Sequence, residues 1–226
     1  MSGGGMGDGP QGDAVRRAEL VAAVRRLDAC GLNRGSTGNA SVRDGTGQGV
    51  WITPTGMGAE VEPDDLAWLS LDGCRVRGRW QPSSEWHFHL AAHRARPGRE
   101  AVLHTHSPHA TALACLRRPL PPFHYMVAIV GGDHVPLVPY HLFGTEALSQ
   151  GVAGALAGVD ACLLANHGLI AAGNSLAQAE KILTEIEALC GIYLQALAVG
   201  EPALLSAADM AEVHERFRGY GRAQRS

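Results

Sequence analysis

The sequence predicts one domain of mixed α/β class whose sheet is antiparallel at least in part. Segments with helical spacing of apolar residues open and close the chain, and short strand-like runs bounded by Gly and Pro lie between them. Residues 64–79 have the pattern of a strand, a turn and a second strand. No linker or repeat divides residues 13–226, which we expect to form the domain, whereas residues 1–12 are rich in Gly and are expected to be a flexible tail.

Helices are predicted where apolar periodicity coincides with capping residues. The opening segment is followed by Gly31, which is suited to end a helix. Ser107 followed by Pro108 is typical of a helix start, and so is the capping-box pattern that begins at Ser206. The predicted helices are residues 13–30, 83–94, 108–116, 146–157, 176–199 and 206–217.

Strands are predicted at short apolar runs between turn residues. Residues 100–105 are expected to be a buried strand, and residues 161–171 a strand pair or a strand and a turn. The predicted strand segments are 35–43, 50–56, the hairpin 64–79, 100–105, 124–130, 135–138 and 161–171.

Composition excludes several classes of function. With 19 basic and 22 acidic residues the net charge is −3, so no basic field favours nucleic acid or an anionic membrane. No run approaches the ~20 apolar residues of a membrane span. The five cysteines are scattered and are expected to be reduced thiols. Because the first residues lack the basic and apolar regions of a signal peptide, we expect a cytoplasmic protein with a small-molecule partner.

Two histidines at the end of the predicted strand 100–105 indicate a metal site. Strand side chains at i and i+2 share a face, so His104 and His106 should point together. A zinc ion needs at least one more protein ligand, and His167, at the end of another apolar run, and Glu85 are available. Alternatively, the two histidines are an ordinary strand pair and Glu85 is an acid favoured by the start of its helix.

Small polar residues near glycines and near a helix start indicate a phosphate-binding site. A helix that begins after Ser83 presents free backbone N–H groups, which bind phosphate well. Each candidate taken alone is equally typical of a turn or a cap. His89, four residues after Glu85, could pair with it and is interpreted as structural. The phosphate candidates are Asn39, Thr55, Gly56, Ser83 and Ser84.

Eight segments in one order carry a resemblance to a known family: GLNRGSTGNASVR (31–43), ITPTG (52–56), PSSEW (82–86), HTH (104–106), HYMVA (124–128), GTEALS (144–149), NHGLIA (166–171) and FRGYG (217–221). Through them the sequence resembles the class II aldolase/adducin family over almost its whole length. From this resemblance we expect a three-layer α/β/α fold with a mostly antiparallel central sheet, assembled as a homotetramer with active sites between subunits. The Gly-Asp-His at residues 132–134 and the Gly-rich first residues depart from the pattern and bear on the substrate.

The resemblance also implies roles for individual residues. His104, His106 and His167 would ligate zinc, together with Glu85 until substrate displaces it and it acts as an acid and base. Tyr125 matches a catalytic tyrosine lent by a neighbouring subunit, and Tyr220 one on the carboxyl-terminal tail. The positions that match phosphate ligands are Asn39, Thr55, Gly56, Ser83 and Ser84.

The implied reaction is the reversible cleavage of a ketose 1-phosphate, such as L-fuculose 1-phosphate, to dihydroxyacetone phosphate and an aldehyde. Lys181 is the only lysine and lies outside every motif, which favours metal over Schiff-base chemistry. The alternatives are another sugar-phosphate aldolase, an epimerase or a dehydratase of the family, a non-catalytic adducin-like module, and a structural zinc site. Tyr125 and Tyr220 favour an aldolase, and a displaceable carboxylate favours a catalytic site.

Overall fold

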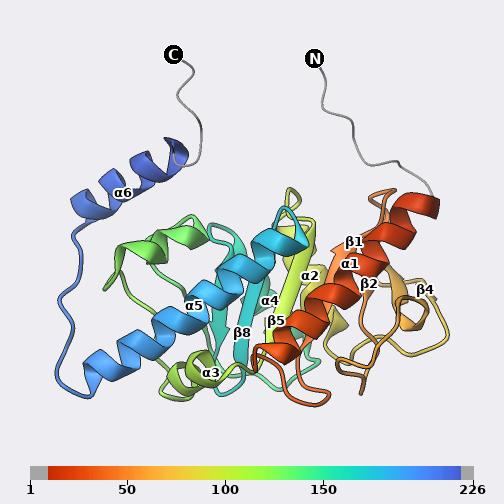
Figure 1. Ribbon diagram of the computed structural model, residues 1–226, viewed down its shortest axis with the longest axis horizontal. Helices are drawn as coiled ribbons and strands as arrows, with labels where there is room; N and C mark the ends of the chain where they lie inside the picture. The colour runs from red at the N-terminus through yellow and green to blue at the C-terminus, as the bar shows by residue number, and fades with distance from the viewer. Residues whose placement is uncertain (1–9, 220–226) are drawn as a thin grey trace.

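The computed structural model describes residues 10–219, in which one mixed sheet lies between two layers of helices (Figure 1). The strand order is β4-β3-β2-β1-β5-β8-β7-β6, and every neighbouring pair is antiparallel except β6 and β7. The predicted fold class is therefore confirmed. The strands are β1 Asn39–Arg43, β2 Gly49–Ile52, β3 Ala67–Ser70, β4 Val76–Arg77, β5 Ala101–Thr105, β6 Leu137–Val138, β7 Ala161–Leu164 and β8 Gly168–Gly173.

Except for α6, which packs against η2, the long helices divide between the two faces of the sheet. In Figure 1, α1 and α5 cross in front of the strands, while α2 and α4 lie behind them. α3 and the 3-10 helix η2 pack on the same face as α1 and α5. The helices are α1 Pro10–Ala29, η1 Pro63–Asp65, α2 Trp86–Ala95, α3 Pro108–Cys115, η2 Tyr125–Val130, α4 Glu146–Leu156, α5 Leu176–Leu197 and α6 Ala207–Gly219.

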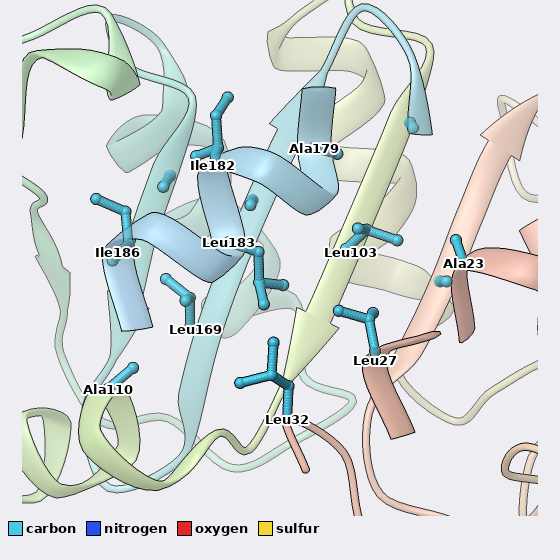
Figure 2. Close-up of a cluster of buried hydrophobic side chains, with 14 of the residues drawn as sticks. Ala23, Leu27, Leu32, Leu103, Ala110, Leu169, Ala179, Ile182, Leu183 and Ile186 are labelled. Atoms are coloured by element: carbon cyan, nitrogen blue, oxygen red, sulfur yellow. The ribbon is translucent and has the colours of Figure 1, made fainter. Parts of the chain in front are cut away.

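The central strands are apolar on both sides, so each face of the sheet has its own core. Leu103 of β5 and Leu169 of β8 meet Leu183 of α5 and Leu27 of α1 (Figure 2). Val102, the neighbour of Leu103, points to the opposite face and joins the core under α2 and α4. This period of two means that His104 shares the α2 side of the sheet with Val102.

Most predicted elements are present, with shifts at their ends. The hairpin at 64–79 is β3 and β4, and the capping box at Ser206 is formed, because its hydroxyl accepts from the backbone N–H of Asp209 at 3.2 Å. α1 begins at Pro10, so the last residues of the expected tail are helical. Among residues 10–219, no helix combines the length and the apolarity needed to span a bilayer.

Two predictions about secondary structure were wrong. Residues 124–130 are not a strand but contain η2, whose Val127 and Val130 are buried in the α5-side core. A short apolar run fits either structure, so its period could not decide between them. The helix expected from Ser83 begins instead at Trp86, because the backbone N–H of Ser83 donates to the carbonyl of Thr53 at 2.9 Å and keeps this segment extended.

Candidate active site

Three histidines meet where β5 ends and β8 begins. His104 lies inside β5 and His106 just after it, while His167 occupies the turn between β7 and β8. Because β5 and β8 are antiparallel neighbours, with Thr105 opposite Leu169, the end of one strand adjoins the start of the other. The ring centroids of the three histidines are therefore 4.8–4.9 Å apart.

The turn that carries His167 depends on its two neighbours. Asn166 has φ 55°, a left-handed conformation that Asn tolerates better than most residues, and its side-chain oxygen accepts from Arg117 at 3.0 Å. At Gly168, a Cβ atom would lie 2.3 Å from the carbonyl oxygen of Thr105. Glycine is thus required for β8 to approach β5 closely enough to bring His167 to the other two rings.

Glu85 reaches the histidines from the N-terminal end of α2. It is the N-cap residue of that helix and is buried. Its Oε1 lies 3.1 Å from Nε2 of His167, and its Oε2 lies 3.4 Å from Nε2 of His104. The candidate ligand atoms of Glu85, His104, His106 and His167 all lie within 4.8 Å of one another, so the structure brings together all four predicted metal ligands.

The four residues fit a divalent metal ion. Nδ1 of His104 is 3.0 Å from the carbonyl oxygen of Leu169, so this nitrogen carries the proton and donates. Nε2 then carries a lone pair, and it is buried without a hydrogen-bond partner. A buried lone pair facing two imidazoles and a carboxylate calls for a cation, and this donor set suits first-row divalent metals.

The protonation states suit metal binding as well. Burial lowers the pKa of His104 to about 3, although the charge of Glu85 opposes this shift, and burial also lowers the pKa of His106. Neutral imidazoles are the form that binds metals. Burial acts to raise the pKa of Glu85, but a hydrogen bond from His167 and the neighbouring His104 outweigh it, so the net shift is downward and the carboxylate is ionised.

A cavity of about 340 Å³ opens beside the four residues. That volume is within the range of ~300–1,000 Å³ usual for small-molecule sites. A larger hollow of about 580 Å³ between α1 and the start of α5 is remote from this cluster, so size alone does not identify the site. The residues that line the 340 Å³ cavity are Glu85, His106, Tyr140, His141, Phe143, Asn166 and His167.

Sequence reasoning missed the aromatic wall of this cavity. Tyr140 and Phe143, in the loop between β6 and α4, are 54% and 60% exposed. Their signal was present in the sequence, because residues 140–143 gather aromatic side chains in a loop, where they have no core to fill.

The predicted phosphate residues of two segments, 55–56 and 83–84, differ in exposure. An antiparallel bridge between Pro54 and Pro82 joins the two segments, so that Thr53 is bonded to Ser83 and Thr55 to Gln81. Thr55, Gly56 and Ser84 are exposed, whereas Ser83 is buried and its hydroxyl accepts from the backbone N–H of Glu85 at 3.3 Å.

Asn39 is buried at the start of β1 and is already bonded on both sides. Its Nδ2 donates to Oε2 of Glu85 at 2.8 Å, and its Oδ1 accepts from Nε2 of His89 at 2.6 Å. His89, interpreted as structural, is linked to the carboxylate through Asn39 and not by the direct pairing with Glu85 that its spacing allowed.

Of the two predicted tyrosines, only Tyr125 lies within the described residues, and it is away from this cavity. Tyr125 is half exposed at the start of η2 and is not among the lining residues. Tyr220 lies outside the residues that the structure describes. Lys181 is exposed on α5 and does not line the cavity.

Comparisons with known proteins give a consistent result. Residues 18–194 match the family described as Class II Aldolase and Adducin N-terminal domain. The chain is 45% identical over 206 residues to a 5-methylthioribulose-1-phosphate/5-deoxyribulose-1-phosphate aldolase of Rhodospirillum rubrum, covering 91% of this chain and 92% of that protein. It is 41% identical over 205 residues to an L-fuculose phosphate aldolase of Escherichia coli, covering 90% and 94%. A solved L-fuculose 1-phosphate aldolase superposes with a TM-score of 0.86 at 38% identity, covering 90% of this chain and 96% of that chain.

Proposed function

Because the chain belongs to the class II aldolase and adducin N-terminal domain family, we propose that it is a zinc-dependent aldolase of ketose 1-phosphates. The products are dihydroxyacetone phosphate and an aldehyde. The resemblance seen in the sequence is confirmed, and so is the enzyme class, since the named relatives are aldolases and hence aldehyde-lyases. The observation that carries the proposal is the cluster of Glu85, His104, His106 and His167, with its buried lone pair on His104.

The mechanism assigns a separate task to each part of the cluster. The three histidines would hold the zinc ion. When bound, the ion supplies Lewis-acid stabilisation of the negative charge that develops as the carbon–carbon bond breaks. Glu85, kept ionised by its neighbours, carries the proton to and from the enediolate carbon, because its carboxylate faces the cavity. Tyr125, lent by a neighbouring subunit, takes the proton of the hydroxyl that becomes the aldehyde during cleavage and returns it to that oxygen in the reverse condensation.

The phosphate of the substrate binds beside Glu85 in this proposal. Ser84 is exposed just before the N-terminal end of α2, where the helix dipole favours an anion, and Thr55 and Gly56 are exposed on the segment that is bridged to Pro82. Ser83 and Asn39 both bond to Glu85, so in this proposal they couple the phosphate site to the proton carrier. We also propose that the protein is cytoplasmic and that it assembles as a homotetramer.

L-Fuculose 1-phosphate is the first candidate substrate, as one of the relatives is named for it. A second candidate is a 5-deoxy- or 5-methylthioribulose 1-phosphate. The aromatic wall of Tyr140 and Phe143 favours it, since apolar rings would bind a methyl or methylthio end better than a hydroxyl. The Rhodospirillum rubrum relative carries the names of these two compounds.

The test is a panel of these three ketose 1-phosphates, scored for release of dihydroxyacetone phosphate by the purified zinc-loaded protein. We expect release from at least one of them and no release by a His104→Ala variant. Conversion of the ketose without cleavage would instead identify an epimerase or a dehydratase. A protein that neither binds zinc nor turns over any of the three would fit an adducin-like module.

A further inference from the structure

A chain of buried hydrogen bonds extends from Glu85 into the space between β1 and α2. Beyond Asn39, Nδ1 of His89 is 2.8 Å from the hydroxyl of Ser41, which is 2.9 Å from Nε2 of His93. Ser41, His89 and His93 are each 0% exposed. None of these three residues touches the cavity, so substrate contact does not account for the chain.

The carboxylate sets the direction of every bond in this chain. An ionised carboxylate only accepts, so the amide nitrogen of Asn39 must face Glu85 and its oxygen must face His89. His89 therefore carries its proton on Nε2 and accepts on Nδ1 from the Ser41 hydroxyl. The Ser41 oxygen in turn accepts from Nε2 of His93, whose Nδ1 is buried without a partner. Each ring thus has one tautomer.

We propose that His89 is a positioning residue, which acts by donating from Nε2 to Asn39 and so holding the amide that orients Glu85. Without this donor the Asn39 amide is free to turn over, and its oxygen would then face the carboxylate oxygen. Glu85 would lose the bond that holds Oε2 beside His104. This inference depends on the proposed function only in the experiments that measure catalytic activity. Outer partners of this kind are worth roughly 10- to 100-fold in metal affinity or activity.

Two substitutions distinguish a positioning role of His89 from a purely structural role, in which its ring only fills a buried space. The side-chain nitrogen of Gln at position 89 would lie where Nε2 lies and could still donate to Asn39, whereas the shorter Asn would reach only toward Ser41. With bound zinc verified, we expect His89→Asn to lower kcat by roughly 10- to 100-fold with little change in KM, and His89→Gln to stay within about threefold of wild type. His87→Gln, on the same helix but outside the chain, is the matched control.

Two further measurements do not depend on catalysis. Competition with a chelator for Co²⁺ should show weaker binding for His89→Asn than for His89→Gln, because only the first releases Glu85. Nitrogen-15 NMR of the metal-free wild-type protein, with His89→Gln identifying the resonance, should show His89 protonated on Nε2. A ring protonated on Nδ1, or equal kcat and Co²⁺ affinity for the two variants, overturns the inference. If the wild type cleaves no ketose 1-phosphate, the proposed function fails, while the Co²⁺ and NMR results still decide this inference.

Discussion

Nδ1 of His104 donates to the backbone carbonyl of Leu169 at 3.0 Å, and this bond turns Nε2 of the same ring toward Glu85. It spans β5 and β8, so the pairing of these two strands also determines which nitrogen is available to a metal. A carbonyl partner on the second nitrogen is the usual arrangement for a metal-binding histidine, since it fixes both the tautomer and the ring orientation.

We therefore predict about one zinc ion per chain, held by His104, His106 and His167. Replacing His104 by Ala should remove most of the metal measured by elemental analysis, because it deletes the fully buried ligand. His134→Ala, which changes an exposed histidine, should retain it. Full occupancy after all three ligand histidines are changed to Ala would place the metal elsewhere.

Glu85→Gln should keep most of the zinc but slow turnover by roughly 10²- to 10⁴-fold, which is the usual worth of a positioned general acid or base. The amide has nearly the same shape and cannot carry the proton. Steady-state kinetics of the zinc-loaded variant measures the effect. Glu146→Gln is the control, because Glu146 is also an acid at a helix start but is exposed in the first turn of α4. A near-normal kcat in Glu85→Gln would reduce Glu85 to a helix-cap residue.

The metal ligands could be predicted because their signals are local. His104 and His106 are two residues apart at the end of an apolar run, and a period of two places such residues on one side of a strand. What could not be predicted depends on contacts between distant segments. The bond from Ser83 to Thr53 moves the start of α2, and the turn of Asn39 toward Glu85 and His89 requires β1 to lie beside α2.

The stability of the metal-free protein should depend on pH through His93. Burial, followed by the charge of Arg43, lowers the pKa of His93 from 6.5 to about 3. The unfolded chain therefore takes up this proton first, so the contribution of His93 is complete above pH 6.5 and falls by about 1.4 kcal/mol per pH unit between pH 6.5 and 3. The buried His89 and His104, whose pKa values are also lowered, add losses in the same direction. Urea unfolding at pH 7 and pH 5 should show a smaller loss in His93→Gln. An equal loss in both proteins would assign the dependence to other groups.

Asp160 should matter for stability more than any surface ion pair. Its side chain is 5% exposed, and it accepts from Arg96 at 2.5 Å and from Arg99 at 2.8 and 2.7 Å. Asp160→Asn removes the charge that both guanidinium groups face and should cost roughly 3 kcal/mol of unfolding free energy, measured by urea denaturation. Glu201→Gln, in an exposed pair with Arg118, should cost less than about 1 kcal/mol. Similar losses in the two variants would mean that burial gives Asp160 no special role.

The last prediction is that Tyr125 serves the active site of a neighbouring subunit. Tyr125 is 50% exposed and does not line the cavity of its own chain, although the family resemblance assigns it to the reaction. Prolines at 119, 121 and 122 stiffen the segment that leads to it. In a cyclic tetramer each interface is head to tail, so every subunit would lend one tyrosine and receive another.

Mixing Tyr125→Phe chains with His104→Ala chains under subunit exchange tests this directly. Some interfaces would then join an intact tyrosine to an intact zinc site, and activity should rise above that of either parent. Tyr140→Phe is the informative comparison, because Tyr140 lines the cavity of its own chain. Its mixture with His104→Ala should show no gain beyond the activity that Tyr140→Phe has alone. If mixed tetramers form and Tyr125→Phe is not rescued, Tyr125 acts within its own chain or has no part in the reaction.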